Sequence, residues 1–263
     1  MKRIILSHLP EDFPWQIHWY DTTNSTNTLA KEMAKNGAPH GTILIAGHQT
    51  GGRGRMGRSF SSPKGMGLYL SMILRPGCPA GELMHLTCAA GLAACDAVAN
   101  ATGYRPGIKW INDLIAEDKK LGGILVEMSV DPKTGLVDYA VIGIGINCLQ
   151  NAADFPPELQ DIAISLKTAT GKAVEIPQLA AQLILSLQEM AQNLSECDAI
   201  LDRYRKDCVT LGREITVIGS SGTRQGTALD IDYAGALVVR FPDGSTEAVN
   251  SGEVSVRGLM GYL

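Results

Sequence analysis

Residues 42–74 read TILIAGHQTGGRGRMGRSFSSPKGMGLYLSMIL, and they place a loop of glycine and arginine between two apolar segments. The segments at 42–46 and 67–74 are continuous apolar runs bounded by turn residues, which predicts two buried β-strands. A loop pinned between two strands is a functional site more often than a free tail is. The stretch therefore predicts a sheet that carries a binding site on its connecting loop.

The loop at 51–58 has the composition of an anion-binding site. Arg53, Arg55 and Arg58 alternate with glycines. A guanidinium group keeps its charge in a protein and offers a planar fork of donors suited to carboxylate or phosphate oxygens. Glycine lets backbone N–H groups approach a bound anion. We expect this loop to be mobile when empty and to order on its ligand, because like charges repel and glycine-rich backbone loses much entropy on ordering.

Two other interpretations of the loop stay open on its composition alone. Gly/Arg repeats also occur in disordered RNA-binding segments and in ordinary solvated loops. The formal charge of −4 argues against a general nucleic-acid coat protein, because binding to the phosphate backbone needs a positive surface.

Composition predicts a globular chain. With 263 residues, of which 45% are hydrophobic, the chain can form one large domain or two unequal ones. No apolar run reaches the roughly 18 residues of a membrane span, and residues 1–8 are too short in their apolar part for a secretory signal, so we expect a cytoplasmic protein. The 6 cysteines show no zinc-like spacing, and they are expected to be reduced core residues with no metal site.

Periodicity predicts an α+β fold with a mixed, mostly antiparallel sheet. After an edge strand near the N-terminus, helices are expected at 27–35, 80–102, 177–193 and 196–207. Further strands are expected at 107–110, 122–128 and 139–147, and the short turns at 117–119 and 131–135 imply antiparallel pairing. Strands and helices are therefore segregated and do not alternate strictly.

From residue 212 the chain changes to short β-type runs broken by turns, which predicts a small C-terminal barrel. The runs lie at 215–218, 224–232, 236–241 and 246–249, with hairpin turns at 220–222 and 242–245. We expect two domains, a catalytic domain at 1–210 and a β-barrel domain at 211–263.

Further segments carry polar side chains that are able to bind or react with a ligand. Residues 24–27 offer hydroxyl and amide groups that serve either a ligand or an ordinary helix cap, and Gln49 stands just before the loop. The segment 109–114 (KWINDL) brings a lysine, an amide and a carboxylate to the end of a strand, where alternation would point Lys109 and Ile111 to one face and Trp110 and Asn112 to the other.

Two glycine-containing segments complete the set. Residues 119–124 put two lysines before a glycine pair, which also fits a solvated turn. Residues 143–147 (GIGIN) hold half of a dinucleotide fingerprint, and better suit close approach of a flat ring with Asn147 to read it. The three arginines and the two lysine sites would neutralise a triphosphate and a carboxylate together, a pattern suited to making an acyl-adenylate.

Taken in order, these segments resemble the signature set of biotin protein ligases over nearly the whole chain, and the segment from 212 is similar to that family's SH3-like domain. The resemblance implies a class II synthetase-like fold, the biotin/lipoate ligase fold, with a small C-terminal SH3-like β-barrel. Met56, Ile111 and Phe60 depart from the residues common in the family, which are arginine, proline and tryptophan.

The family's site residues carry over where the residues match. For biotin the resemblance implies Ser25, Thr26, Asn27, Gln49, Arg53, Gly54, Arg55, Lys120, Gly123 and Leu125. For ATP it implies Arg53, Arg55, Arg58, Phe60, Lys109, Asn112 and Asn147. The catalytic group would comprise Arg55, Lys120, Asp113 and Lys109, with Asp113 orienting the acceptor lysine.

The reaction implied is that of a biotin–[acetyl-CoA-carboxylase] ligase, in which biotin and MgATP give biotinyl-5′-AMP, and a lysine of a biotin carboxyl carrier protein or domain then takes the biotinyl group. The implied substrates and cofactors are biotin, ATP and Mg²⁺. No DNA partner is expected, because residues 25–27 come too early for the winged helix of the family's regulatory members. No membrane partner is expected either, because no long apolar run was found. The resemblance allows a homodimer through an exposed sheet edge.

Two alternatives remain: a lipoate-type ligase of the same fold, and a non-catalytic nucleic-acid-binding protein that uses the Gly/Arg loop. Whether the protein activates biotin or lipoate distinguishes it from the lipoate-type ligase. Salt-sensitive binding of RNA would support the nucleic-acid-binding alternative.

Overall fold

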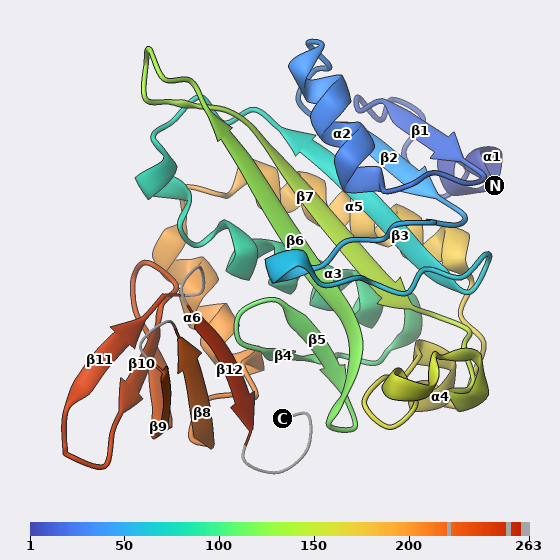
Figure 1. Ribbon diagram of the computed structural model, residues 1–263. Helices are drawn as coiled ribbons and strands as arrows, with labels where there is room; N and C mark the ends of the chain where they lie inside the picture. The colour runs from blue at the N-terminus through green and yellow to red at the C-terminus, as the bar shows by residue number, and fades with distance from the viewer. Residues whose placement is uncertain (220–221, 251–253, 259–263) are drawn as a thin grey trace.

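Seven strands form one mixed sheet in the computed structural model, which describes residues 1–219, 222–250 and 254–258 (Figure 1). The strand order is β1-β2-β3-β7-β6-β5-β4, with β1 and β2 parallel and the other neighbours antiparallel. The predicted α+β class with a mostly antiparallel sheet is confirmed. The strands are β1 Ile17–Tyr20, β2 Thr42–Ala46, β3 Gly67–Leu74, β4 Gly107–Lys109, β5 Asp113–Ala116, β6 Lys119–Val130 and β7 Val137–Asn147.

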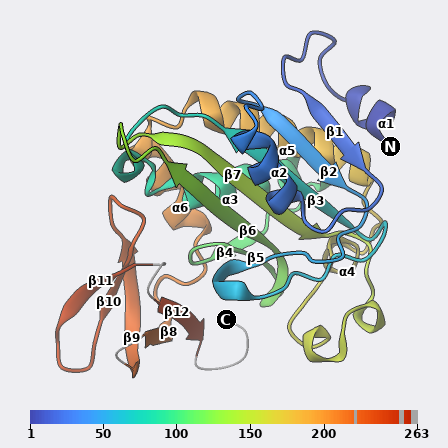
Figure 2. The same cartoon turned by 45° about the horizontal axis from the view of Figure 1, so that its top comes forward.

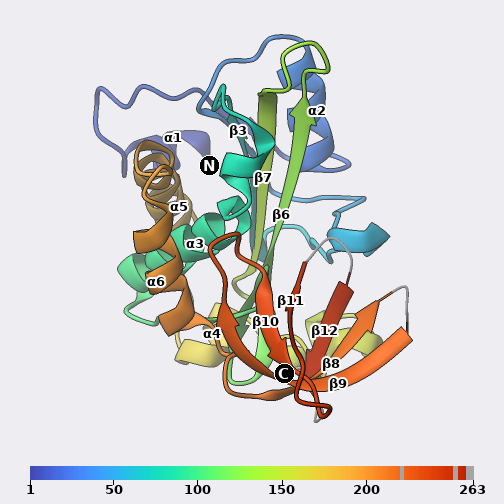
Figure 3. The same ribbon diagram turned by 90° about the vertical axis from the view of Figure 1, so that its left-hand side faces the viewer.

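Helices cover the two faces of this sheet unequally (Figures 1 and 3). On one face lies α2 (Thr26–Lys35), which packs Ala30 and Ala34 on β2, β3 and β7 and leaves part of that face open. On the other face lie α3 (Leu86–Thr102) and α5 (Ile176–Gln192), which enclose the main core. The remaining helical segments are α1 Lys2–Leu6, η1 Arg55–Gly57, η2 Ala80–Leu83, η3 Ala152–Asp154, η4 Pro157–Leu159, α4 Leu166–Thr170 and α6 Cys197–Asp207.

One helical stretch in the described part of the chain, Ala80–Thr102, is long and apolar enough to cross a membrane by length and composition. This corrects the expectation that no apolar run reaches that length. In the structure 72% of its apolar window is buried inside the protein. A helix packed between a sheet and α5 has no polar face to show, so its apolarity follows from its place in the core.

The cysteines are free, as predicted. Four of them, Cys88, Cys95, Cys148 and Cys208, are buried, and Cys78 and Cys197 are half-buried. Burial raises the pKa of the Cys148 thiol to about 12, which keeps it protonated and unreactive.

A second, antiparallel sheet follows α6, in the order β11-β10-β9-β8-β12. Figure 2 shows it to one side of the main sheet. Four of its strands match predicted runs, whereas β12 was not predicted. The predicted turn at 220–222 lies partly outside the described residues. The domain boundary at 210 stays a prediction. The strands are β8 Glu214–Gly219, β9 Gly222–Ile231, β10 Leu237–Arg240, β11 Thr246–Val249 and β12 Val254–Gly258.

Buried hydrogen bonds tie the turn that follows β4 to α6 and to the C-terminal part of the chain. Trp110 donates its indole N–H to the carbonyl of Gly235 at 3.0 Å and its backbone N–H to the hydroxyl of Thr210 at 2.9 Å. The Tyr204 hydroxyl donates to the carbonyl of Ile111 at 3.2 Å. Helix α6, the segment after it and the β9–β10 turn of the C-terminal sheet together hold the turn that leads to Asn112 and Asp113.

We expect Trp110→Phe to lower the free energy of unfolding by about 1–3 kcal/mol, because the buried carbonyl of Gly235 would lose its donor. Trp19→Phe is the matched control: its indole N–H bonds the exposed carboxylate of Asp21, where water can replace it, so about 0.5 kcal/mol or less is expected. Urea unfolding of both variants measures the difference. Equal losses would contradict a buried bond between the sheets.

Candidate active site

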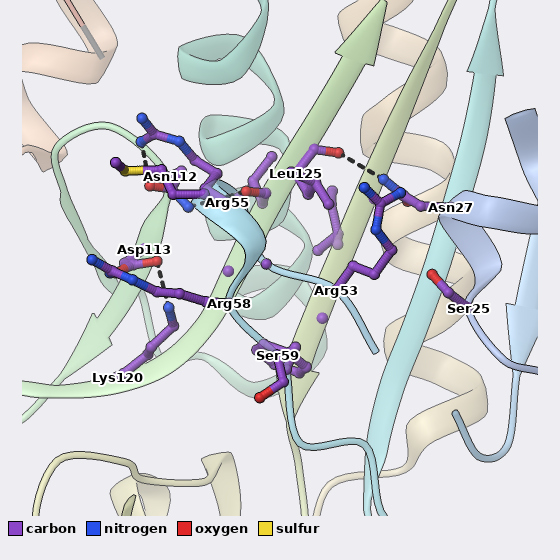
Figure 4. A pocket seen from close by; sticks show the side chains of 18 of the residues that line it. Ser25, Asn27, Arg53, Arg55, Arg58, Ser59, Asn112, Asp113, Lys120 and Leu125 are labelled. Atoms are coloured by element: carbon purple, nitrogen blue, oxygen red, sulfur yellow. Dashed lines mark hydrogen bonds and ion pairs between the residues drawn. The ribbon is translucent and has the colours of Figure 1, made fainter. Parts of the chain in front are cut away.

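A cavity of about 490 Å³ lies on the open part of the sheet face that carries α2. Strands β6 and β7 form its floor, and the loop at 51–62 and the turn after β4 form its walls (Figure 4). Of the predicted site residues, all but one line it: Ser25, Thr26, Asn27, Gln49, Arg53, Gly54, Arg55, Arg58, Phe60, Lys109, Asn112, Asp113, Lys120, Gly123 and Leu125.

The arginine loop folds back on itself over the floor of the cavity. The N–H of Gly54 donates to the carbonyl of Arg58 at 2.7 Å, and the N–H of Phe60 donates to the carbonyl of Gly52 at 2.9 Å. A Cβ on Gly52 would lie 2.6 Å from the Ser62 hydroxyl oxygen, so glycine lets the two arms of the loop close. Ordering of the loop on a ligand stays a prediction.

The three arginines point in different directions from this loop (Figure 4). Arg53 points toward Asn27, Arg55 toward Asn112, and Arg58 toward the side of Asp113 and Lys120. Arg55 donates through Nη1 to the Asn112 amide oxygen at 2.9 Å, and the amide nitrogen of Asn112 donates to the backbone carbonyl of Ile124 at 3.1 Å. Arg55 is thereby held to the β6 backbone.

Burial lowers the pKa of the Arg55 guanidinium, while the charge of Asp113 acts in the opposite direction. Guanidinium groups start from so high a pKa that Arg55 stays charged. A cation held in a partly desolvated wall interacts more strongly with a bound anion than one in water does.

Hydrogen bonds fix the polar end of the cavity. The side-chain oxygen of Gln49 accepts from the Thr26 N–H at 2.8 Å and from its hydroxyl at 3.1 Å. The buried Ser71 hydroxyl lies 2.7 Å from the Thr26 hydroxyl and 2.6 Å from the Asn27 amide oxygen. Ser25 also caps α2, weakly, by accepting from the Thr28 N–H at 3.5 Å. Capping and a position in the cavity wall are therefore compatible.

The glycines of β7 make room for protein side chains. A Cβ on Gly143 would lie 2.7 Å from Cγ of Asn27, and one on Gly145 would lie 2.6 Å from Cε1 of Phe60. We expected these glycines to admit a flat ring; in the structure the ring over Gly145 is that of Phe60. Glycines in a strand indicate from the sequence that space is left above the strand, but the sequence does not show which group fills that space.

A carboxylate and an ammonium face each other at the other end of the cavity. Nζ of Lys120 donates to Oδ1 of Asp113 at 2.6 Å. These side chains come from the adjacent strands β5 and β6, which pair as a hairpin. A positive φ at Glu117 and Asp118 forms the tight turn between these strands, which were predicted only in part because β5 is short and mixed in composition.

The expected alternation along 109–112 is wrong. Strand β4 ends at Lys109, and the following residues form the turn to β5. Both Lys109 and Asn112 therefore line the same cavity, together with Trp110. Alternation holds only while the backbone stays extended.

Asn147 is the predicted site residue that does not line the cavity. It is 5% exposed, and its amide nitrogen lies 3.2 Å from the carbonyl oxygen of Ile164 and 3.5 Å from that of Lys120. Direct reading of adenine by Asn147 would require this amide to change partners. Its role stays a prediction.

Several lining residues were not identified from the sequence. They are uncharged side chains whose types carry no chemical signal, although some of them lie inside the segments that the sequence analysis singled out. The set comprises Met56, Ser59, Leu70, Trp110, Ile124, Gly143, Ile144, Gly145 and Ile162.

The features to be placed are a cavity lined mainly by cations on a mixed sheet and a small antiparallel sheet near the C-terminus. Residues 19–147 match the Biotin/lipoate A/B protein ligase family, and residues 210–257 match the Biotin protein ligase C terminal domain. The chain belongs to this family, on its biotin protein ligase side.

Individual relatives agree with this placement. The bifunctional ligase/repressor BirA of Bacillus subtilis is 35% identical over 231 residues, which cover 86% of this chain and 70% of that one. The biotin–[acetyl-CoA-carboxylase] ligase of Mycobacterium tuberculosis is 33% identical, covering 88% and 85%. Among solved structures, the biotin protein ligase of Aquifex aeolicus in complex with biotin and ATP superposes with a TM-score of 0.79 at 28% identity, covering 94% of this chain and 100% of that one.

Proposed function

We infer that this chain is an ATP-dependent biotin protein ligase, which activates biotin to biotinyl-5′-AMP and transfers biotin to a lysine of a carboxyl carrier protein. The observation that carries the inference is the charge of the cavity. Its lining holds five cationic side chains and one carboxylate, and one end is lined by the uncharged polar side chains of residues 25–27 and Gln49, with Arg53 as the cation that points toward it. Such a cavity suits an acid with a polar head group and a nucleoside triphosphate together.

The first step brings two anions together. A carboxylate oxygen of biotin attacks the α-phosphorus of ATP, and the bond to the β-phosphate breaks to release pyrophosphate. Cations at this point offset the repulsion and stabilise the charge on the leaving group. Arg53, Arg55 and Lys120 would hold the carboxylate and the α-phosphate. Arg58 and Lys109 would hold the departing phosphates.

The neutral end would select the acid. Ser25, Thr26 and Asn27 offer donors and acceptors for the ureido ring of biotin, and Gln49 holds Thr26 in place. Leu125 supplies an apolar wall for the fused rings. A site built from fixed polar groups rejects an acid that cannot pair with them, because those groups would lose their partners.

The adenine would lie against Phe60, whose ring packs over Gly145 and offers a stacking surface. Mg²⁺ would arrive bound to the phosphates of ATP, since protein sites for Mg²⁺ commonly combine substrate phosphates with one or two carboxylates. Asp113 is the carboxylate that lines the cavity.

The second step needs a lysine amine without its proton. That amine attacks the carbonyl carbon of the mixed anhydride, and AMP leaves. Asp113 would orient the incoming lysine and ease its deprotonation. In the structure Asp113 is paired with Lys120, so the two side chains would exchange partners as the acyl-adenylate draws Lys120 toward its phosphate.

Biotin-dependent exchange of labelled pyrophosphate into ATP tests the function, with lipoate and octanoate run in parallel. Exchange with biotin alone is expected. Exchange with lipoate alone would point to the lipoate branch of the family. Absence of exchange with every acid would contradict a ligase and would favour the RNA-binding interpretation of the loop.

We expect Asp113→Asn to slow transfer far more than adenylation, by about tenfold to 100-fold, because the amide keeps the shape but cannot accept a proton. Single-turnover transfer from preformed biotinyl-5′-AMP to a biotin carrier domain measures the second step, and pyrophosphate exchange measures the first. Equal losses in both steps would assign Asp113 to adenylation. Asp118→Asn, in the exposed turn of the same hairpin, is the control and should change neither rate.

A further inference from the structure

Glu127 is an acidic side chain beside a cavity that is lined mainly by cations. Alternation along β6 puts it on the same face of the sheet as Gly123 and Leu125, which line the cavity. Its side chain is 20% exposed. A carboxylate in this position needs a physical reason, because it repels a bound carboxylate or phosphate.

The contacts of Glu127 connect it to the loop and to α2. Nη1 of Arg53 lies 3.1 Å from both carboxylate oxygens, and the amide nitrogen of Asn27 donates to Oε2 at 3.1 Å. Nζ of Lys31 lies 2.7 Å from Oε1. Burial alone would raise the pKa of Glu127, but the hydrogen bonds from Lys31 and Asn27 and the charge of Arg53 outweigh it and lower that pKa. Glu127 is therefore ionised at neutral pH.

These contacts explain why Arg53 points away from the other two arginines. Its guanidinium lies toward Asn27, at the neutral end of the cavity, whereas Arg55 and Arg58 point toward the charged end (Figure 4). The Asn27 amide is also fixed by other groups, since its nitrogen donates to the carbonyl of Leu125 at 3.1 Å and its oxygen bonds Ser71. The carboxylate of Glu127 is the acidic partner that the structure gives Arg53.

We propose that Glu127 is the counterion that holds Arg53 at the neutral end of the ligand-free site, and that the acid substrate must draw Arg53 away from it. This inference rests on the proposed function, because the competing anion is the carboxylate of biotin. An ion pair that exists only in the ligand-free protein reduces the fraction of molecules that are ready to bind. The apparent affinity for the ligand falls in proportion to that fraction. Glu127 is thus a positioning residue that acts through Arg53.

Lys31 modulates this competition from outside the cavity. It lies on α2 and shares the carboxylate of Glu127 with Arg53. Without the Lys31 charge, Arg53 is the remaining charged partner of Glu127 among these contacts. The attraction between Arg53 and Glu127 then becomes stronger, because the carboxylate no longer shares its charge with a second cation. Substitutions at Glu127 and Lys31 should therefore act in opposite directions on the same ligand.

Titration calorimetry with biotin and with biotin methyl ester tests the proposal. The ester keeps the ureido ring and the fused rings but has no charge for Arg53 to bind. We measure the ratio of the two affinities, biotin over ester, for the wild type, Glu127→Gln and Lys31→Met. Glutamine keeps an oxygen that accepts from Asn27, so the neutral end is retained.

Glu127→Gln should raise the ratio by about two- to fivefold, the range for a partly exposed ion pair, and Lys31→Met should lower it. In an Arg53→Met background, Glu127→Gln should leave the ratio unchanged. A loss of affinity that is equal for biotin and ester in Glu127→Gln would mean that Glu127 only supports Asn27, and would overturn the proposal. If Glu127→Gln fails to fold, an unchanged ratio in Lys31→Met overturns it.

The same titrations separate this inference from the function on which it rests. Wild-type protein that binds neither ligand would contradict the biotin ligase function, and the inference with it. Wild-type protein that binds biotin, together with a Glu127→Gln ratio that stays the same or falls, would contradict the inference alone.

Discussion

Arg55→Ala is expected to reduce biotin-dependent exchange of pyrophosphate into ATP by about 100-fold or more, the size of effect seen when one charge-stabilising donor is removed from an active site. The structure ties Arg55 to the floor of the cavity through Asn112 and the β6 backbone. A donor already held in place stabilises developing charge without reorganisation during the reaction.

The control for this variant is Arg203→Ala, on α6. Arg203 also donates to a neighbouring acceptor, Asp96, but its side chain is half-exposed and does not line the cavity. Its loss should leave exchange within about twofold, because exposed ion pairs contribute little. Thermal unfolding of both variants establishes that each is folded. Comparable exchange in Arg55→Ala and wild type would remove Arg55 from the catalytic group.

Gly143→Ala is expected to lower the affinity for biotin by about 30- to 100-fold, equivalent to about 2–3 kcal/mol. The added Cβ would lie 2.7 Å from Cγ and 2.9 Å from Nδ2 of Asn27, distances that force the amide to move. That amide bonds Ser71, Leu125 and Glu127. Displacing it leaves buried polar groups without partners and removes a predicted contact of the ureido ring.

The same substitution should lower the free energy of unfolding by about 2–4 kcal/mol, from overpacking and from the broken hydrogen bonds. Gly81→Ala is the matched control, because a Cβ there meets nothing within 4 Å. Calorimetric titration with biotin and urea unfolding measure the two effects. Wild-type affinity in Gly143→Ala would show that Asn27 can move without cost to binding.

Prediction from sequence worked best where a short, local stretch of residues carries the signal. The loop arginines, the capping hydroxyl of Ser25 and the KWIND segment are local patterns, and each predicted site residue except Asn147 lines one cavity. The two apolar strands around the loop were placed correctly because buried strands are continuous runs of apolar residues.

Prediction failed where a neighbour from elsewhere in the chain decides the outcome. Residues 109–112 leave the extended conformation because contacts from Thr210 and Tyr204 hold a turn there. Glu127 was missed because a single glutamate in a strand has no local signature; its partners lie 74 to 100 positions away in the chain.

The sequence by itself determined the α+β class, the order of most elements, and the chemical inventory of the site, since these depend on periodicity and on side-chain type. The tertiary structure decided which of those side chains share a cavity and with whom each is paired. Asp113 with Lys120, and Glu127 with Arg53, are pairs made when strands and loops are brought together. Ion pairs and close contacts depend on distances between residues remote in sequence, and only the folded backbone sets those distances.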